Sequence, residues 1–171
     1  MNESIFRSVP KLGDFKIPFK LEEKSLLNWL ADLNHVDGKE ACSQTLSLLQ
    51  TLNKSELASK NYLVFLNLIN DYLKQYIKRL DHSCWDAGFP LSLEENTYAE
   101  MVVWNYLILG KSFFIAADNS NKKNDTILSL AMALQALGQA QLHIAAVYST
   151  PGNAFWRLAY QIFALAEKRN S

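Results

Sequence analysis

One stretch in the second half of the chain constrains the fold most. Residues 125–149, DTILSLAMALQALGQAQLHIAAVYS, contain few polar residues, and three of these, Gln135, Gln139 and His143, follow one another at four-residue steps. On an α-helix this spacing places the three side chains in one narrow stripe and leaves the remaining circumference apolar. A helix that is apolar on nearly every side needs protein around it. Residues 125–149 are therefore predicted to form the central helix of a bundle.

The remaining helices are expected from apolar periodicity, capping residues and helix-breaking residues. They are predicted at residues 22–34, 37–52, 55–80, 93–118 and 151–169. Residues 1–21 contain Pro10, Gly13 and Pro18, which disfavour a helix, and Phe15, Ile17 and Phe19 alternate there as in an extended chain. The expected fold is an all-α antiparallel helical bundle of about six helices, with an extended N-terminal arm at 1–21 and one bundle domain at 22–171.

The composition indicates the cellular compartment of the protein and excludes some classes of binding partner. The chain has 17 basic and 17 acidic residues, so it lacks the positive charge that nucleic acid or an anionic membrane would favour. Its two cysteines, Cys42 and Cys84, are too few for a disulfide framework and indicate a reducing compartment. The most membrane-like window, residues 101–117, is interrupted by Asn105 and Lys111 and is shorter than a typical span. We expect a soluble cytoplasmic protein that binds neither nucleic acid nor membrane.

Residues capable of chemistry are scattered. Metal-capable side chains cluster in the segment His82-Ser83-Cys84-Trp85-Asp86, but a zinc site needs four ligands, usually two pairs at set spacing. The acid pairs Glu22-Glu23 and Glu94-Glu95 stand at expected helix starts, where the helix dipole explains them. We therefore predict no enzyme activity, no catalytic residue, no cofactor and no metal. The alternative is a helical-bundle enzyme or small-ligand binder, with Gln135, Gln139 and His143 as candidate polar pocket.

The helix expected at 93–118 carries more large apolar side chains than one inward face needs. Either its neighbours cover it completely, or part of it forms a surface for self-association or for another protein, where aromatic residues are enriched. The candidate interface residues are Phe15, Phe19, Trp104, Phe113 and Phe114. The function favoured by the residues is that of a protein–protein interaction or signalling scaffold domain, with a second copy or a downstream domain of its own chain as partner.

An ordered series of short motifs also resembles a known domain. It comprises Asn28-Trp29-Leu30, Leu49 to Asn53, Phe89-Pro90-Leu91, Tyr148, Pro151-Gly152, Trp156, Tyr160 and Ala166-Glu167. The series is similar to an all-helical N-terminal domain of gammaproteobacterial proteins, some of which carry downstream PilZ-type cyclic di-GMP-binding domains. The resemblance implies a signalling module within a longer regulatory protein. The chain itself has no Arg-x-x-x-Arg motif, so the resemblance places cyclic di-GMP on none of its residues.

Overall fold

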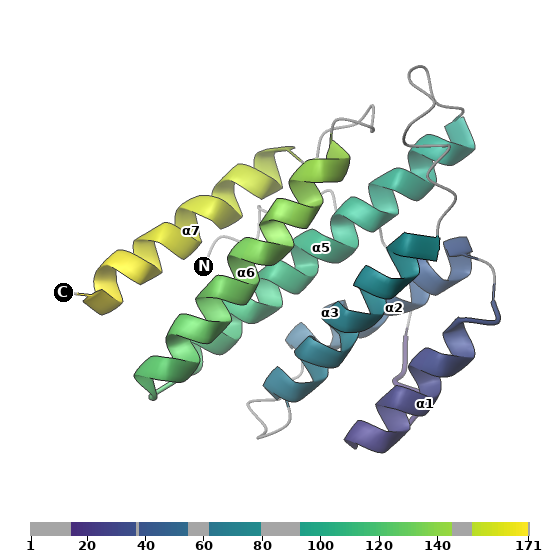
Figure 1. Cartoon of the computed structure of the whole chain (residues 1–171), viewed down its shortest axis with the longest axis horizontal. Coiled ribbons are helices and arrows are strands. Elements are labelled where there is room, and N and C mark those ends of the chain that lie inside the picture. The colour runs from purple at the N-terminus through teal and green to yellow at the C-terminus, as the bar shows by residue number, and fades with distance from the viewer. Residues whose placement is uncertain (1–14, 37, 55–61, 80–92, 145–151, 171) are drawn as a thin grey trace.

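The computed structural model describes residues 15–36, 38–54, 62–79, 93–144 and 152–170. These residues form six α-helices and no strand, so the predicted all-α fold is confirmed (Figure 1). The helices are α1 (Glu23–Leu33), α2 (Gly38–Lys54), α3 (Tyr62–Arg79), α5 (Leu93–Asn119), α6 (Lys123–Ile144) and α7 (Gly152–Asn170). Residues 1–14 of the predicted arm, the predicted helix start at Ser55 and the pair His82 and Cys84 lie outside the described residues.

The central helix is α5, and the prediction that residues 125–149 occupy this position is wrong. Every residue of α5 from Met101 to Phe113 is buried, and α5 packs against α2, α3, α6 and α7. By contrast α6 buries one face, whereas Ile127, Leu128 and Leu134 on its other face are 54%, 50% and 41% exposed. Both sequences are apolar all round, and periodicity does not say which of two such helices other helices surround. The larger side chains of α5 allow more burial per residue there.

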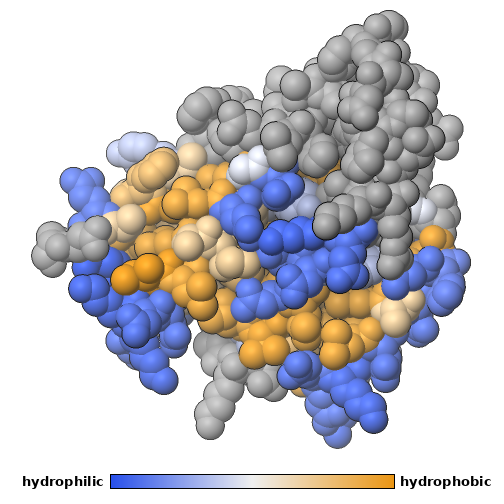
Figure 2. Space-filling view, in the orientation of Figure 1, coloured by the Kyte–Doolittle hydropathy of each residue, from blue (hydrophilic) through white to orange (hydrophobic). Residues whose placement is uncertain are grey.

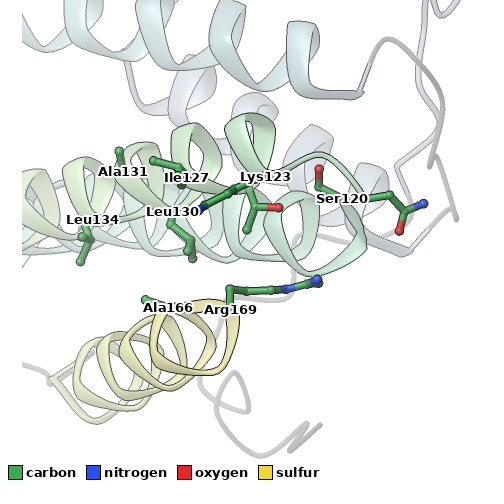
Figure 3. Close-up of a pocket in the computed structure, with 10 residues that line it drawn as sticks. Ser120, Lys123, Ile127, Leu130, Ala131, Leu134, Ala166 and Arg169 are labelled. Atoms are coloured by element: carbon green, nitrogen blue, oxygen red, sulfur yellow. The ribbon is translucent and has the colours of Figure 1, made fainter. Parts of the chain in front are cut away.

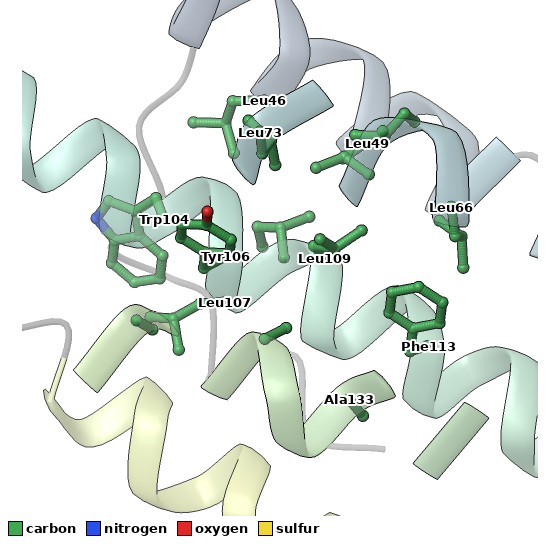
Figure 4. Packing of buried hydrophobic residues seen from close by; sticks show 14 of the residues in the cluster. Leu46, Leu49, Leu66, Leu73, Trp104, Tyr106, Leu107, Leu109, Phe113 and Ala133 are labelled. Atoms are coloured by element: carbon green, nitrogen blue, oxygen red, sulfur yellow. The ribbon is translucent and has the colours of Figure 1, made fainter. Parts of the chain in front are cut away.

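Among the described helices, α5 and α6 form the most extensive contact. They run antiparallel and are joined by the short turn at residues 120–122 (Figure 1). A Cβ at Gly110 of α5 would lie 3.5 Å from the carbonyl oxygen of Ala133, 3.5 Å from the Cβ of Ala136 and 3.2 Å from Leu158 Cδ2. Small residues on both helices therefore let their backbones approach. In Figure 4, Leu107 points from α5 toward α6, whereas Phe113 lies beside Leu66 of α3.

Helices α2 and α3 pack against α5, and α1 packs on α3. The spacing of Leu26, Leu27, Leu30 and Leu33 predicts one inward face of α1; Leu26, Leu30 and Leu33 are buried, whereas Leu27 is 46% exposed. Outside α1, residues 15–22 contain no helix, and Phe15 and Phe19 pack on Trp29 with ring centroids 6.5 and 5.3 Å apart. The described part of the arm is thus docked on the bundle through aromatic contacts.

Two buried polar networks connect α5 to its neighbours. In the first, Asn105 accepts a hydrogen bond from Thr45 Oγ1 at 2.7 Å and donates through Nδ2 to the carbonyl of Cys42 at 3.0 Å. In the second, Asn53 Oδ1 lies 2.8 Å from the Tyr62 hydroxyl and 2.6 Å from the Ser112 hydroxyl. Burial raises the pKa of Tyr62 to about 12, and the hydrogen bond to Ser112 offsets part of this rise. Paired polar groups at fixed positions specify one register for these helices.

The segment Met101–Asn119 of α5 is long and apolar enough to cross a membrane. Inside this fold, however, 78% of its most apolar window is buried by other helices. A core helix of a helical bundle has the same length and composition. The segment therefore acts as the interior of the bundle.

Candidate interaction groove

A groove of about 490 Å³ lies between the first half of α6 and the last turns of α7 (Figure 3). Its apolar lining consists of Ile127, Leu130, Ala131 and Leu134 from α6 and Ala166 from α7. Its polar lining consists of Ser120, Asn121, Lys123, Thr126 and Arg169, which gather near the turn between α5 and α6. The groove is therefore apolar along its length and cationic at one end.

The start of α6 fixes the polar end of the groove. The Ser120 hydroxyl accepts a hydrogen bond from the amide of Lys122 at 3.2 Å, which tightens the turn before the helix. Thr126 Oγ1 donates to the carbonyl of Lys122 at 3.1 Å, and the Thr126 side chain is 4% exposed. With Thr126 turned inward, residues 130 and 134, one and two turns later, fall on the flank that faces α7.

The cations of the groove differ in their contacts. Arg169 Nη2 donates a hydrogen bond to the carbonyl oxygen of Asp118 at 2.8 Å, in the last turn of α5. A cation at the carboxyl end of a helix interacts favourably with its dipole. Arg169 therefore holds the end of α7 against the end of α5, whereas Lys123 lies exposed at the rim.

Exposed large apolar side chains occur on both helices that form the groove, and two of them, Ile127 and Leu134, line it. On α7, Tyr160 is 77% and Phe163 is 61% exposed, and on α6 Ile127, Leu128 and Leu134 are at least 41% exposed. Figure 2 shows hydrophobic surface over these two helices on the left of the view. Single exposed apolar residues are ordinary, but a group of them around one concave site is typical of a contact surface.

The predicted polar stripe of α6 lies on a different side of the helix. Gln135 is exposed, and its Oε1 accepts hydrogen bonds from Lys74 Nζ at 3.1 Å and Asn70 Nδ2 at 3.5 Å, both on α3. It therefore forms a seam between α6 and α3. Gln139 is half-buried, and the side chain of His143 lies outside the described residues. Neither Gln135 nor Gln139 lines the groove, so the candidate polar pocket does not coincide with it.

The five predicted interface residues occupy three different environments. Trp104 and Phe113 are 1% and 0% exposed, so they belong to the core of one chain and are inaccessible to a partner. Phe114 is half-buried beside Lys111, and Phe15 and Phe19 are half-buried on Trp29. The structure does not bring the five together on one surface. The physical reason is that α2, α3, α6 and α7 together cover the whole central part of α5.

One charged side chain lies deep between α5 and α7. Lys111 is 3% exposed, its Nζ lies 3.3 Å from Gln161 Oε1, and it is 4.8 Å from the centre of the Phe114 ring. Burial lowers the pKa of Lys111 to about 8, and the negative charge of Asp118 offsets part of this effect. Within the described ranges, no group of three His, Cys, Asp or Glu residues could hold a metal ion.

The groove was missed at the level of sequence because its apolar lining residues on α6 were assigned to the core of the bundle. A signal was present: Tyr160 and Phe163 fall outside the inward stripe of Leu158, Ile162 and Leu165 on the last helix. Residues 127, 131, 134 and 138 also repeat at steps of four, three and four, which marks a second apolar stripe on α6.

Comparison with known proteins gives one match. Residues 24–171 match the family model described as "Cyclic-di-GMP receptor FimW, N-terminal domain". The match begins within one residue of the start of α1 and includes every described helix after it. No curated protein and no solved structure matches the chain.

Proposed function

Because the chain belongs to the family of the N-terminal domain of the cyclic-di-GMP receptor FimW, we propose that it is a non-catalytic signalling module that binds protein through the groove between α6 and α7. The family description supports a regulatory role. In this proposal the domain is cytoplasmic, in keeping with its two cysteines and balanced charge.

The observation that carries the proposal is the group of exposed apolar side chains on α6 and α7, the two helices that form the groove. Tyr160 and Phe163 each leave most of their surface in water. An aromatic side chain buries roughly 150–250 Å² when a protein interface covers it completely. Covering apolar surface contributes about 25 cal/mol per Å². A partner that covers the two rings therefore gains several kcal/mol before the costs of association.

A protein fits the groove better than a small charged nucleotide does. Five of its ten lining residues are apolar, and of its two cations Arg169 already donates to the carbonyl of Asp118. A dinucleotide with two phosphates needs several charge-assisted hydrogen bonds close together. In our proposal the cyclic dinucleotide is bound elsewhere in the receptor, and this domain transmits the signal by docking.

Site-specific photo-crosslinking tests the proposal. A photoreactive amino acid replaces Phe163 in the protein as expressed in its native cell, and the matched control places it at Leu27, a 46% exposed residue of α1. We expect protein adducts, identified by mass spectrometry, from position 163 and none from position 27. The absence of any adduct from position 163 overturns the proposed docking surface.

A further inference from the structure

The exposed face of α6 contains a regular stripe that no part of the described chain covers. Ile127, Ala131, Leu134 and Gly138 are all exposed and follow one another at steps of four, three and four. This is the 3.5-residue period with which two helices pack side by side at a shallow angle. The stripe covers roughly 17 Å of the helix axis, at 1.5 Å per residue.

The sizes of these four side chains alternate as large, small, large, small. In an antiparallel pair of α6 helices centred between residues 132 and 133, Ile127 lies opposite Gly138 of the second copy, and Ala131 lies opposite Leu134. Each large side chain then meets a small one, which allows interdigitation at close range. A parallel pair in register would instead place Ile127 opposite Ile127 and Gly138 opposite Gly138. Large side chains would then clash with each other, and the small residues would leave gaps.

From this self-complementarity we infer that the partner at the groove is a second copy of this chain, bound through an antiparallel α6–α6 contact with two-fold symmetry. A two-fold interface requires one surface patch to complement itself, and this stripe does so. The inference rests on the proposed function, because it names the partner of that same groove. Ile127, Ala131 and Leu134 also line the groove, so a second α6 enters it directly.

The surroundings of the stripe leave room for a second helix. Apart from its chain neighbours and its own helix backbone, no atom of the described residues lies within 4 Å of the position that a Cβ of Gly138 would occupy, so the backbone there is open to close approach. Phe163 of α7 is 61% exposed and precedes the groove residue Ala166 by three positions, so it lies on the same side of α7 and can widen the apolar contact. Ala131 and Leu134 are labelled on α6 in Figure 3.

The charges are compatible with this arrangement. The stripe contains no charged residue, and Leu128 and Gln135, which flank it, are also uncharged. In the antiparallel register, Lys122 and Lys123 lie opposite residues 142 and 143 of the second copy, in the last turn of its α6. The carboxyl end of a helix attracts cations, whereas its amino end repels them. The dimer therefore places the two lysines, which stand at the amino end of one α6, beside the carboxyl end of the other. The formal net charge of zero adds little repulsion between copies.

The test measures the oligomeric state of the whole chain by sedimentation equilibrium, with wild type and size variants. We expect a dimer. Gly138→Leu sets a second large side chain against Ile127 of the other copy and should weaken dimerisation roughly tenfold or more. The double variant Ile127→Ala/Gly138→Leu restores a large side chain opposite a small one and should recover most of that loss. Ala31→Leu, which places a leucine on the exposed side of α1, is the control.

The second pair repeats the test independently of how well Gly138→Leu folds. Ala131→Leu should weaken the dimer, and Ala131→Leu/Leu134→Ala should recover it. A wild-type monomer at about 100 μM, where a dimer of micromolar Kd is nearly complete, overturns the inference. The inference is also overturned if neither single variant weakens the dimer. It is overturned as well if neither double variant recovers the dimerisation that the single variants lose. If position 163 still crosslinks to other proteins, the proposed docking function survives that failure.

Discussion

Two buried polar residues of α5 show that the effect of a polar side chain on stability depends on its burial and on its hydrogen-bond and charge partners. Asn105 is fully buried, yet its polar atoms are all hydrogen-bonded. Its Oδ1 accepts from Thr45 Oγ1, and its Nδ2 donates to the carbonyl of Cys42 and, at 2.9 Å, to the carbonyl of Met101. Lys111 is nearly as buried, and its Nζ lies 3.3 Å from Gln161 Oε1. Burial lowers the pKa of Lys111 more than the negative charge of Asp118 raises it, so the charged form is less favourable here than in water, whereas a buried amide with its hydrogen bonds made is tolerated.

Replacing Lys111 by Met is expected to stabilise the fold at pH 7 by roughly 1–3 kcal/mol, because Met keeps the packing on Phe114 and removes the desolvated charge. The pKa of Lys111 is about 8 in the folded chain and 10.5 in the unfolded chain. Between these values the unfolded chain binds more protons, so the wild-type free energy of unfolding rises with pH across this window. Urea denaturation at pH 7 and pH 10 measures both.

The gain from Lys111→Met should therefore be largest below pH 8 and should shrink as the pH approaches 10.5. Lys24→Met, at an exposed lysine of α1, is a suitable control because its charge is already solvated. A Lys111→Met variant that is less stable than wild type at pH 7 would show that the contacts of Lys111 outweigh its desolvation.

At the scale of the element, α5 and α6 contain similar proportions of apolar residues but have opposite environments. The surroundings of the glycine in each helix show this difference in packing. Gly110 of α5 lies at the junction with Leu158 and Ala136, whereas Gly138 of α6 has open space where a side chain would be. A helix that is apolar all round is a central helix only when other helices surround it.

Alanine substitutions at the two glycines should separate these environments. Gly138→Ala is expected to raise the free energy of unfolding of the monomer by about 1 kcal/mol, the difference in helix propensity between the residues. Gly110→Ala should gain less or lose stability, because its Cβ would lie 3.2 Å from Leu158 Cδ2 and the neighbour must move. Urea denaturation of dilute protein measures the two values, and equal gains would contradict this account of the packing.

At the scale of the whole molecule, the described surface has few sites at which several cations could meet a nucleotide. The described arginine side chains, Arg157 and Arg169, stand twelve positions apart on α7, roughly 18 Å along the axis. Arg169 also donates to the carbonyl of Asp118. Such a separation does not permit both guanidinium groups to clamp one phosphate.

We therefore expect that cyclic di-GMP does not bind to this chain by itself. Isothermal titration of the purified chain with cyclic di-GMP should give no binding heat at micromolar concentrations, where specific nucleotide sites are readily detected. Replacing Arg157 and Arg169 together should leave that result unchanged. Saturable binding by the wild-type chain, lost in this double variant, would show instead that the domain is itself a nucleotide site.

The sequence by itself determined the helices of this protein and their class. Apolar periodicity located all six described helices, and the segment 93–118 was recognised as too apolar for a solvated face, since periodicity and capping are local properties of the chain. The ordered series of Trp, Pro and Tyr residues also pointed to the family that the match over residues 24–171 confirms.

Only the tertiary structure decided which apolar surfaces are covered. It placed Trp104 and Phe113 in the core, left Ile127 and Phe163 in solvent, and turned Gln135 toward α3. Burial depends on what lies beyond the helix in space, and two helices with equal hydrophobicity compete for the same central position. The sequence records the apolar area that each helix carries, whereas the packing of the other helices determines how much of that area water still reaches.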